Sequence, residues 1–163
     1  MNAAHLHLML NHVPVLGVVF GMALLGIGLL RENRLLQQTG LIVLAGAAVA
    51  AAGAFLTGRE AEDIVEDRLR NVDSFIHSHE DNALFALVAA GLTGLLSVVA
   101  LWLGRGARVL SRGLLRLTFA VAVVASLLMA WVANLGGRIS HPEARPGDQV
   151  SAEAPRGEAD EDH

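Results

Sequence analysis

The chain has 163 residues, of which 53% are hydrophobic and 17% are charged, and its formal net charge is −4. It contains no cysteine, which excludes disulfides, thiolate metal ligands and a cysteine nucleophile. Its arginines form no basic patch of the kind that binds nucleic acid, so we expect no nucleic-acid partner.

Four stretches of the chain carry no charged residue over a length that suits a membrane span. A hydrocarbon core of about 30 Å requires about 20 apolar residues in a helix, and helices of soluble domains are rarely apolar on all sides. The sequence therefore predicts an all-α fold, an integral membrane four-helix bundle of up-down topology over residues 1–141. The expected spans are residues 6–30, 38–57, 80–103 and 114–136.

The first expected span combines a glycine stripe with a histidine segment ahead of it. Small residues on one face let membrane helices approach closely. The stripe consists of Gly17, Gly21 and Gly28. His5 and His12 share nearly the opposite face, and His7 lies closer to the stripe. Pro14 frees the carbonyl near Leu10 and predicts a kink there, so periodicity leaves open which face of the histidine segment looks inward.

The connection over residues 57–82 contains two patterns that are typical of helix starts. Thr57 with Glu60 and Ser78 with Asp81 match capping boxes. Apolar residues recur at helical spacing between the two boxes, and acidic residues surround them. The pattern predicts a short amphipathic helix on the outer face of the membrane. Ser78 would then start the third span, which places His79 in its first turn.

Small residues also line one face of the third span, and His79 lies on the same face. The stripe consists of Ala83, Ala86, Ala90, Gly94 and Ser97. We therefore expect His79 to point toward the bundle interior. At the end of the fourth span, Asn134 is a deeply placed amide that needs an interior partner. Gly137 and Pro142 predict that this helix stops early.

Arginine density predicts the orientation of the bundle. The short loops after the first and third spans hold six arginines, whereas those of the opposite side are spread over more residues. Short arginine-rich loops stay in the cytoplasm. We therefore expect a multi-pass protein of the inner (cytoplasmic) membrane with both termini and the 57–82 connection on the non-cytoplasmic side. Residues 142–163 are acidic and almost devoid of apolar side chains, which predicts a disordered tail.

Six of the seven histidines gather where the apolar stretches meet this outer side. A histidine within a membrane segment is costly unless it has a partner, and two imidazoles from different helices can hold an iron inside a bundle. We expect His12 and His79 to be the axial ligands of a haem b with an electron-transfer role. The further candidates are His7 and His141 as ligands, Arg59 and Arg138 as partners of the propionates, and Asn134.

Two other interpretations stay open. The pairs His5–His7 and His77–His79 contain the ligand type that suits copper or zinc, although a helix splays the two rings of such a pair. Alternatively, the histidines only form polar contacts in a non-redox structural subunit or scaffold of a membrane complex. The sequence shows no Ser-His-Asp arrangement, phosphate-binding glycine loop or HExxH motif, which favours an electron carrier over an enzyme.

The segment from His7 to Pro14, HLMLNHVP, resembles the opening motif His-Pro-x-x-x-His-Phe-Pro of an uncharacterised bacterial membrane family. His7, His12 and Pro14 match this motif, whereas Leu8 and Val13 depart from it. The Thr-Gly at the end of the second span, the His-Glu at the start of the third and the Gly-Gly at the end of the fourth also look similar. The resemblance implies four helices. Some members of the family are joined to Rieske-type iron–sulfur domains, which implies redox work and a Rieske-type or other redox partner.

Overall fold

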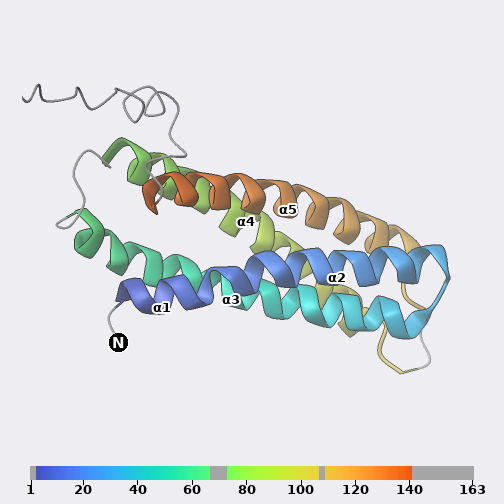
Figure 1. Cartoon of the computed structure of the whole chain (residues 1–163). Coiled ribbons are helices and arrows are strands. Elements are labelled where there is room, and N and C mark those ends of the chain that lie inside the picture. The colour runs from blue at the N-terminus through green and yellow to red at the C-terminus, as the bar shows by residue number, and fades with distance from the viewer. Residues whose placement is uncertain (1–2, 67–72, 107–108, 141–163) are drawn as a thin grey trace, which may run out of the picture.

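A computed structural model of the chain describes residues 3–66, 73–106 and 109–140, and over these residues it contains helices and no strands (Figure 1). The helices are α1 (Ala3–Leu10), α2 (His12–Leu30), α3 (Arg34–Glu66), α4 (Asp73–Leu103) and α5 (Arg112–Ser140). Four segments are long and apolar enough to cross a membrane, with α1 and α2 together forming the first: His5–Leu30, Arg34–Ala61, Ile76–Leu103 and Arg112–Ile139. The prediction of an all-helical chain with four long apolar helices is confirmed.

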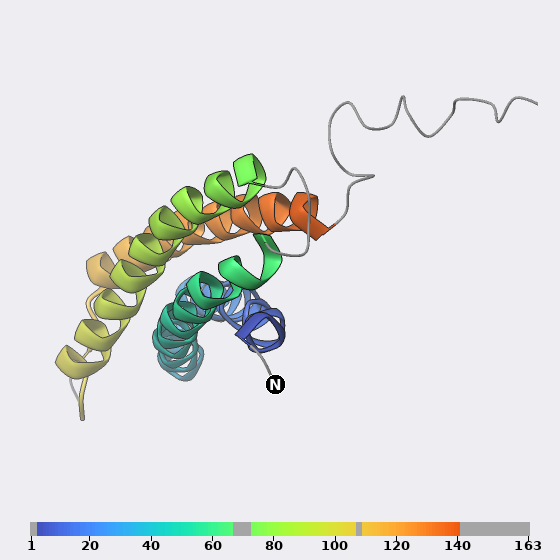
Figure 2. The same cartoon turned by 90° about the vertical axis from the view of Figure 1, so that its left-hand side faces the viewer.

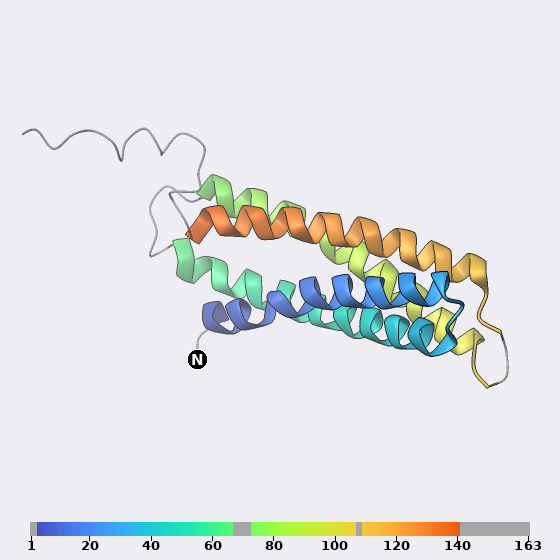
Figure 3. The ribbon, with the colours of Figure 1, turned by 45° about the vertical axis from the view of Figure 1, so that its right-hand side comes forward.

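The four long segments alternate in direction and form two antiparallel pairs. The first hairpin consists of α1 and α2 packed on α3, and the second consists of α4 packed on α5 (Figures 1 and 2). The start of α1, the end of α3, the start of α4 and the end of α5 lie at one end of the bundle, which we call the histidine end. The α2–α3 and α4–α5 connections lie at the opposite end, the arginine end (Figure 3).

Large apolar side chains cover the outside of the bundle. Phe20, Val49 and Phe85 are exposed by 62%, 75% and 64%, and residues like them recur along every span. A soluble domain rarely leaves so much contiguous apolar surface uncovered. The exposed apolar surface is therefore compatible with contact to a lipid bilayer.

Glycines bring α2 and α3 into close contact, as the stripe on the first span predicts. A Cβ atom placed on Gly17 would come within 2.8 Å of the Ala47 Cβ, and one placed on Gly21 within 2.8 Å of the Leu44 Cγ. From the facing side, a Cβ on Gly40 would lie 2.7 Å from the backbone nitrogen of Leu25. Backbones pack this closely only where side chains are absent.

The small-residue stripe of α4 packs against the rest of the bundle, which confirms that prediction too. Ala86, Ala90 and Ser97 are buried, and a Cβ on Gly94 would lie 2.5 Å from the Ala48 Cβ of α3. The buried hydroxyl of Ser97 donates to the Thr93 carbonyl one turn earlier. The polar atoms of this interface are thus satisfied within their own helix.

The first span is divided at Asn11, between α1 and α2, near the point where Pro14 predicts a kink, and Asn11 itself keeps helical backbone angles (φ −61°, ψ −26°). Pro14 lies in the first turn of α2 and has no backbone N–H to offer the carbonyl of Leu10. The Asn11 N–H donates to the His7 carbonyl at 2.9 Å, so the last turn of α1 stays closed. The break separates the histidine segment from the glycine-packed part of the span.

The 57–82 connection differs from the expected separate helix. Thr57 lies inside α3 and its hydroxyl donates to the carbonyls of Gly53 and Ala54, so it extends a helix and does not start one. Ser78 lies inside α4, which begins at Asp73. The capping-box interpretation of both residues is wrong because the amphipathic sequence prolongs the two long helices. Residues 67–72 lie outside the described residues.

The end of the fourth span also differs from the prediction. Helix α5 continues through Gly137 to Ser140, so Gly137 does not terminate it. His141 and the acidic tail over 142–163 lie outside the described residues.

Candidate functional site

His7 connects α1 to α3 at the histidine end. Its ring is half-buried, and Nδ1 lies 2.8 Å from the carbonyl oxygen of Ala54. A carbonyl oxygen only accepts hydrogen bonds, so Nδ1 carries the proton and the neutral ring keeps a lone pair on Nε2. The ring lies on Gly58, where a Cβ atom would come within 3.0 Å of Cε1. The glycine makes the room that the imidazole occupies.

His79 makes the same connection from α4 to α5. Its Nδ1 lies 3.1 Å from the carbonyl oxygen of Val132, and the half-buried ring lies on Gly136. A Cβ atom at Gly136 would come within 3.1 Å of the His79 Cε1. By the same reasoning, Nδ1 donates and Nε2 keeps its lone pair in the neutral ring.

The two hairpins therefore repeat one arrangement. In each, the inner histidine of an HxH pair on the first helix donates to a carbonyl of the second helix and packs on a glycine one turn after that carbonyl. An arginine follows each glycine closely, Arg59 in the first hairpin and Arg138 in the second. Sequence reasoning missed this repeat, although the two HxH pairs and the glycine-arginine endings are visible signals of it.

The two histidines lie at the same end of the bundle, one on each hairpin. A contact between the hairpins flanks them: Arg59 Nε lies 3.8 Å from Glu80 Oε1, which joins α3 to the residue after His79. Both side chains of this pair are partly exposed, so water screens it.

His12, in contrast, is exposed. Its Nδ1 lies 3.3 Å from the Leu8 carbonyl, one turn earlier in the same span. His5 and His77, the outer members of the HxH pairs, are exposed as well. Of the described histidines, the structure brings His7 and His79 into the bundle and leaves the other three outside.

The other residues predicted for the site are exposed or half-buried where the structure describes them. Asn134 is exposed on α5, which differs from the interior position expected for its amide. Arg59 is exposed and paired with Glu80, and Arg138 is half-buried near the end of α5. His141 lies outside the described residues.

Asn11 is a polar residue that sequence reasoning overlooked. It lies one turn after His7, and its Oδ1 is buried without a hydrogen-bond partner among the described residues. A buried acceptor without a donor costs about 1–3 kcal/mol. The corresponding position one turn after His79 is Ala83, so this amide is peculiar to the first hairpin.

The HxH pairs do not present two rings to one ion. On a helix, residues two apart point in different directions, and one ring of each pair is half-buried while the other is exposed. Over the described part of the chain, no three His, Cys, Asp or Glu side chains gather into a group that could hold a metal ion. The inward-facing donor set there consists of two imidazoles from two hairpins.

Comparisons with known protein families, with curated proteins and with solved structures found no match to this chain. The site consists of two half-buried imidazoles, each lying on a glycine and each directing Nδ1 at a carbonyl oxygen of the facing helix.

Proposed function

We propose that the chain is a membrane protein that binds haem b at the histidine end and transfers electrons, with His7 and His79 as axial ligands. The observation that carries this proposal is the pair of hydrogen bonds from Nδ1 to the carbonyls of Ala54 and Val132. A ligating histidine typically donates its other ring N–H to a carbonyl, carboxylate or water, which fixes the tautomer and the ring plane. Both rings meet this condition.

The number of ligands also favours haem over a bare metal ion. A porphyrin supplies four nitrogens to its iron and leaves two axial positions, which two imidazoles can fill. Structural zinc sites usually take four protein ligands and catalytic ones three. Two inward-facing histidines from facing hairpins match the haem requirement.

The structure favours His7 over His12 as the partner of His79. An axial ligand in a bundle must point inward, and the exposed His12 bonds only within its own helix. His12 lies five residues after His7 and so points to a different side of the helix from the inward face that His7 occupies. His79 remains a ligand in the proposal, as the sequence predicted.

The glycines and arginines at the histidine end fit the same role. Gly58 and Gly136 leave each ring a flat backbone surface, so the ring plane is held without a competing side chain. Arg59 and Arg138 follow these glycines and supply positive charge for the two propionates. The ion pair of Arg59 with Glu80 is long and solvent-exposed, so the guanidinium can exchange that partner at little cost.

The bound haem would supply reversible one-electron chemistry at iron. The protein would hold the rings, keep their Nδ1 protons in place and limit water through its apolar helices. By the arginine rule the histidine end faces the non-cytoplasmic side of the inner membrane, where a Rieske-type or other redox protein is the expected partner.

A visible spectrum of the purified protein, recorded before and after dithionite reduction, tests the proposal. We expect reduced b-type bands with one haem per chain. His7→Ala and His79→Ala should each lose most of the haem, whereas His12→Ala and His77→Ala, matched changes at exposed rings, should keep it. A colourless protein with stoichiometric copper or zinc would contradict the proposal in favour of a metal-ion site.

A non-redox scaffold is the second candidate, and one observation favours it. The same two hydrogen bonds tie α1 to α3 and α4 to α5, so the histidines also act as connections between helices. In that case the purified protein would carry neither haem nor metal. His7→Ala and His79→Ala would then lower stability alone, by about 1 kcal/mol each.

A further inference from the structure

The arginine end contains a cavity of about 370 Å³ that the histidine site does not involve. It lies between the α2–α3 turn and the start of α5, so both hairpins contribute to it. Its polar lining includes Glu32, Arg34, Arg112 and Arg116. Gln37, four leucines and a valine form the rest, among them Leu30 and Val109, which are exposed by 86% and 88%. The cavity thus joins a basic surface to apolar side chains at the ends of the spans.

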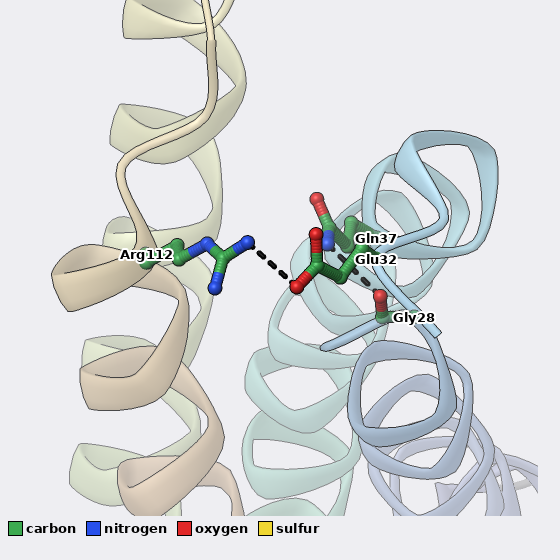
Figure 4. Close-up of polar contacts among 4 residues, drawn as sticks. All are labelled: Gly28, Glu32, Gln37 and Arg112. Carbon is green, nitrogen blue, oxygen red and sulfur yellow. Dashed lines mark hydrogen bonds and ion pairs between the residues drawn. The ribbon is translucent and has the colours of Figure 1, made fainter. Parts of the chain in front are cut away.

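Positive charge exceeds negative charge in this cavity. Glu32 is the only acid among its lining residues, and its Oε1 lies 2.7 Å from an Arg112 nitrogen (Figure 4). Arg34 donates to the carbonyls of Gly104 and Gly106 at 2.8 and 2.6 Å, which leaves its charge without a carboxylate. Arg116 makes no hydrogen bond or ion pair within the described part of the chain. Two guanidinium charges are therefore uncompensated.

The turn that carries Glu32 is held in a defined shape. Glu32 has a φ of 52°, a left-handed conformation that favours glycine. The Asn33 N–H and the Gln37 side-chain amide both donate to the Gly28 carbonyl, each at 2.9 Å, and the second of these bonds is drawn in Figure 4. The Glu32 carboxylate is paired with Arg112, and no further acid among the lining residues faces Arg34 or Arg116.

We propose that this cavity binds the phosphate group of an anionic phospholipid. Arginine recognises phosphate through paired, charge-assisted hydrogen bonds. The positive charges of Arg34 and Arg116 are not balanced by a carboxylate among the lining residues. A lipid fits the cavity better than free phosphate because the exposed Leu30 and Val109 would lie beside its acyl chains. The cavity is at the level where α2 ends and α3 and α5 begin, which is where headgroups meet the hydrocarbon core. The proposal is independent of the haem.

Native mass spectrometry of the full chain in non-ionic detergent tests this site, with added phosphatidylglycerol, phosphatidylcholine or inorganic phosphate. We expect saturable binding of phosphatidylglycerol that is stronger than binding of phosphatidylcholine. Arg116→Gln should weaken it about tenfold, the loss expected for one charge-assisted hydrogen bond. Arg31→Gln removes the same charge from the α2–α3 turn, at a residue that does not line the cavity, and should change the dissociation constant less than about twofold.

Arg116 has no described partner, so its replacement should leave the fold intact, which circular dichroism checks. Arg116→Lys, which keeps the charge and loses the paired geometry, should bind with intermediate affinity. Equal binding of phosphatidylglycerol by the wild type and Arg116→Gln would overturn the proposal. Arg116-dependent binding of inorganic phosphate without binding of phosphatidylglycerol would overturn the lipid assignment.

Discussion

The two hairpins hold their inner histidines in the same way but on different backbones. In the first, His7 lies on the short helix α1, which a break at Asn11 separates from the rest of its span. In the second, His79 lies within the unbroken helix α4. Both rings nevertheless donate from Nδ1 to a carbonyl across the hairpin and lie on a glycine. The shared feature is the carbonyl and glycine on the second helix, and continuity of the first helix is not required for it.

The hairpins also differ in how closely their helices pack. In the first, α2 and α3 approach each other so closely that a Cβ atom added at Gly17, Gly21 or Gly40 would lie 2.8 Å or less from an atom of the facing helix. In the second, no described glycine of α4 or α5 brings the backbones of these two helices together in this way. Substitutions at the glycines, at Asn11 and at Glu80 test whether these differences between the hairpins affect haem binding and stability.

The largest effect is expected from filling the space under each ring. Gly58→Leu or Gly136→Leu would push the imidazole from its place, since even a Cβ atom would lie 3.0 or 3.1 Å from Cε1. Overpacking of about 1–3 kcal/mol predicts about a tenfold or greater loss of haem affinity. The amount of haem bound per chain after purification measures this loss of affinity. The matched controls are Gly53→Leu and Gly137→Leu, where a Cβ meets nothing within 4 Å. Equal haem content in all four variants would show that Gly58 and Gly136 do not shape the haem site.

A smaller effect, on stability alone, is expected from Gly40→Ala in the first hairpin. The added methyl would lie 2.7 Å from the Leu25 nitrogen, so α2 and α3 must separate. We expect the free energy of unfolding to fall by about 1–3 kcal/mol, measured by denaturation in mixed detergent. Gly46→Ala, on the same helix with open space around it, should leave stability within about 0.5 kcal/mol. If both substitutions behaved alike, close packing would not explain the glycine stripe.

Exchanging Asn11 and Ala83 tests the position one turn after each histidine. Asn11→Ala removes a buried acceptor without a partner and should raise the free energy of unfolding by about 1 kcal/mol. Ala83→Asn should not stabilise the second hairpin, because it introduces an amide on a packed face. The same unfolding assay measures both variants. A loss of stability in Asn11→Ala would mean that the Oδ1 atom has a partner in the membrane-embedded protein.

The smallest effect is expected at the ion pair between the hairpins. Glu80→Gln should change the free energy of unfolding by less than about 0.5 kcal/mol, because the pair is long and screened by water. A loss above 2 kcal/mol would show that Arg59 and Glu80 hold the hairpins together.

The length and composition of the spans were sufficient to predict the four helices, because a membrane span is defined by about 20 apolar residues more than by any contact. The glycine and alanine stripes likewise predicted the faces that pack. Two features escaped prediction for identifiable reasons. The Thr57 pattern resembles a cap, but its hydroxyl can equally bond back to Gly53 and Ala54 inside a helix.

The choice between His7 and His12 was the second feature that sequence could not decide. His7 lies five residues before His12, so the two rings point to different sides of the helix, and the histidines alone do not say which side faces the bundle. His79 lies on the same unbroken helix as the alanine stripe, and its inward direction was predicted correctly. The glycine stripe, which lies closer to His7 than to His12, was the signal in the sequence that favoured His7.

Ligand replacement tests the central claim most directly. His7→Met and His79→Met keep a potential axial ligand on each hairpin but exchange imidazole for thioether, which raises the haem midpoint potential. We predict that each variant shifts the potential upward and alters the low-spin electron paramagnetic resonance signal of the oxidised protein, while His12→Met changes neither. A wild-type signal and potential in His7→Met or His79→Met would contradict the account.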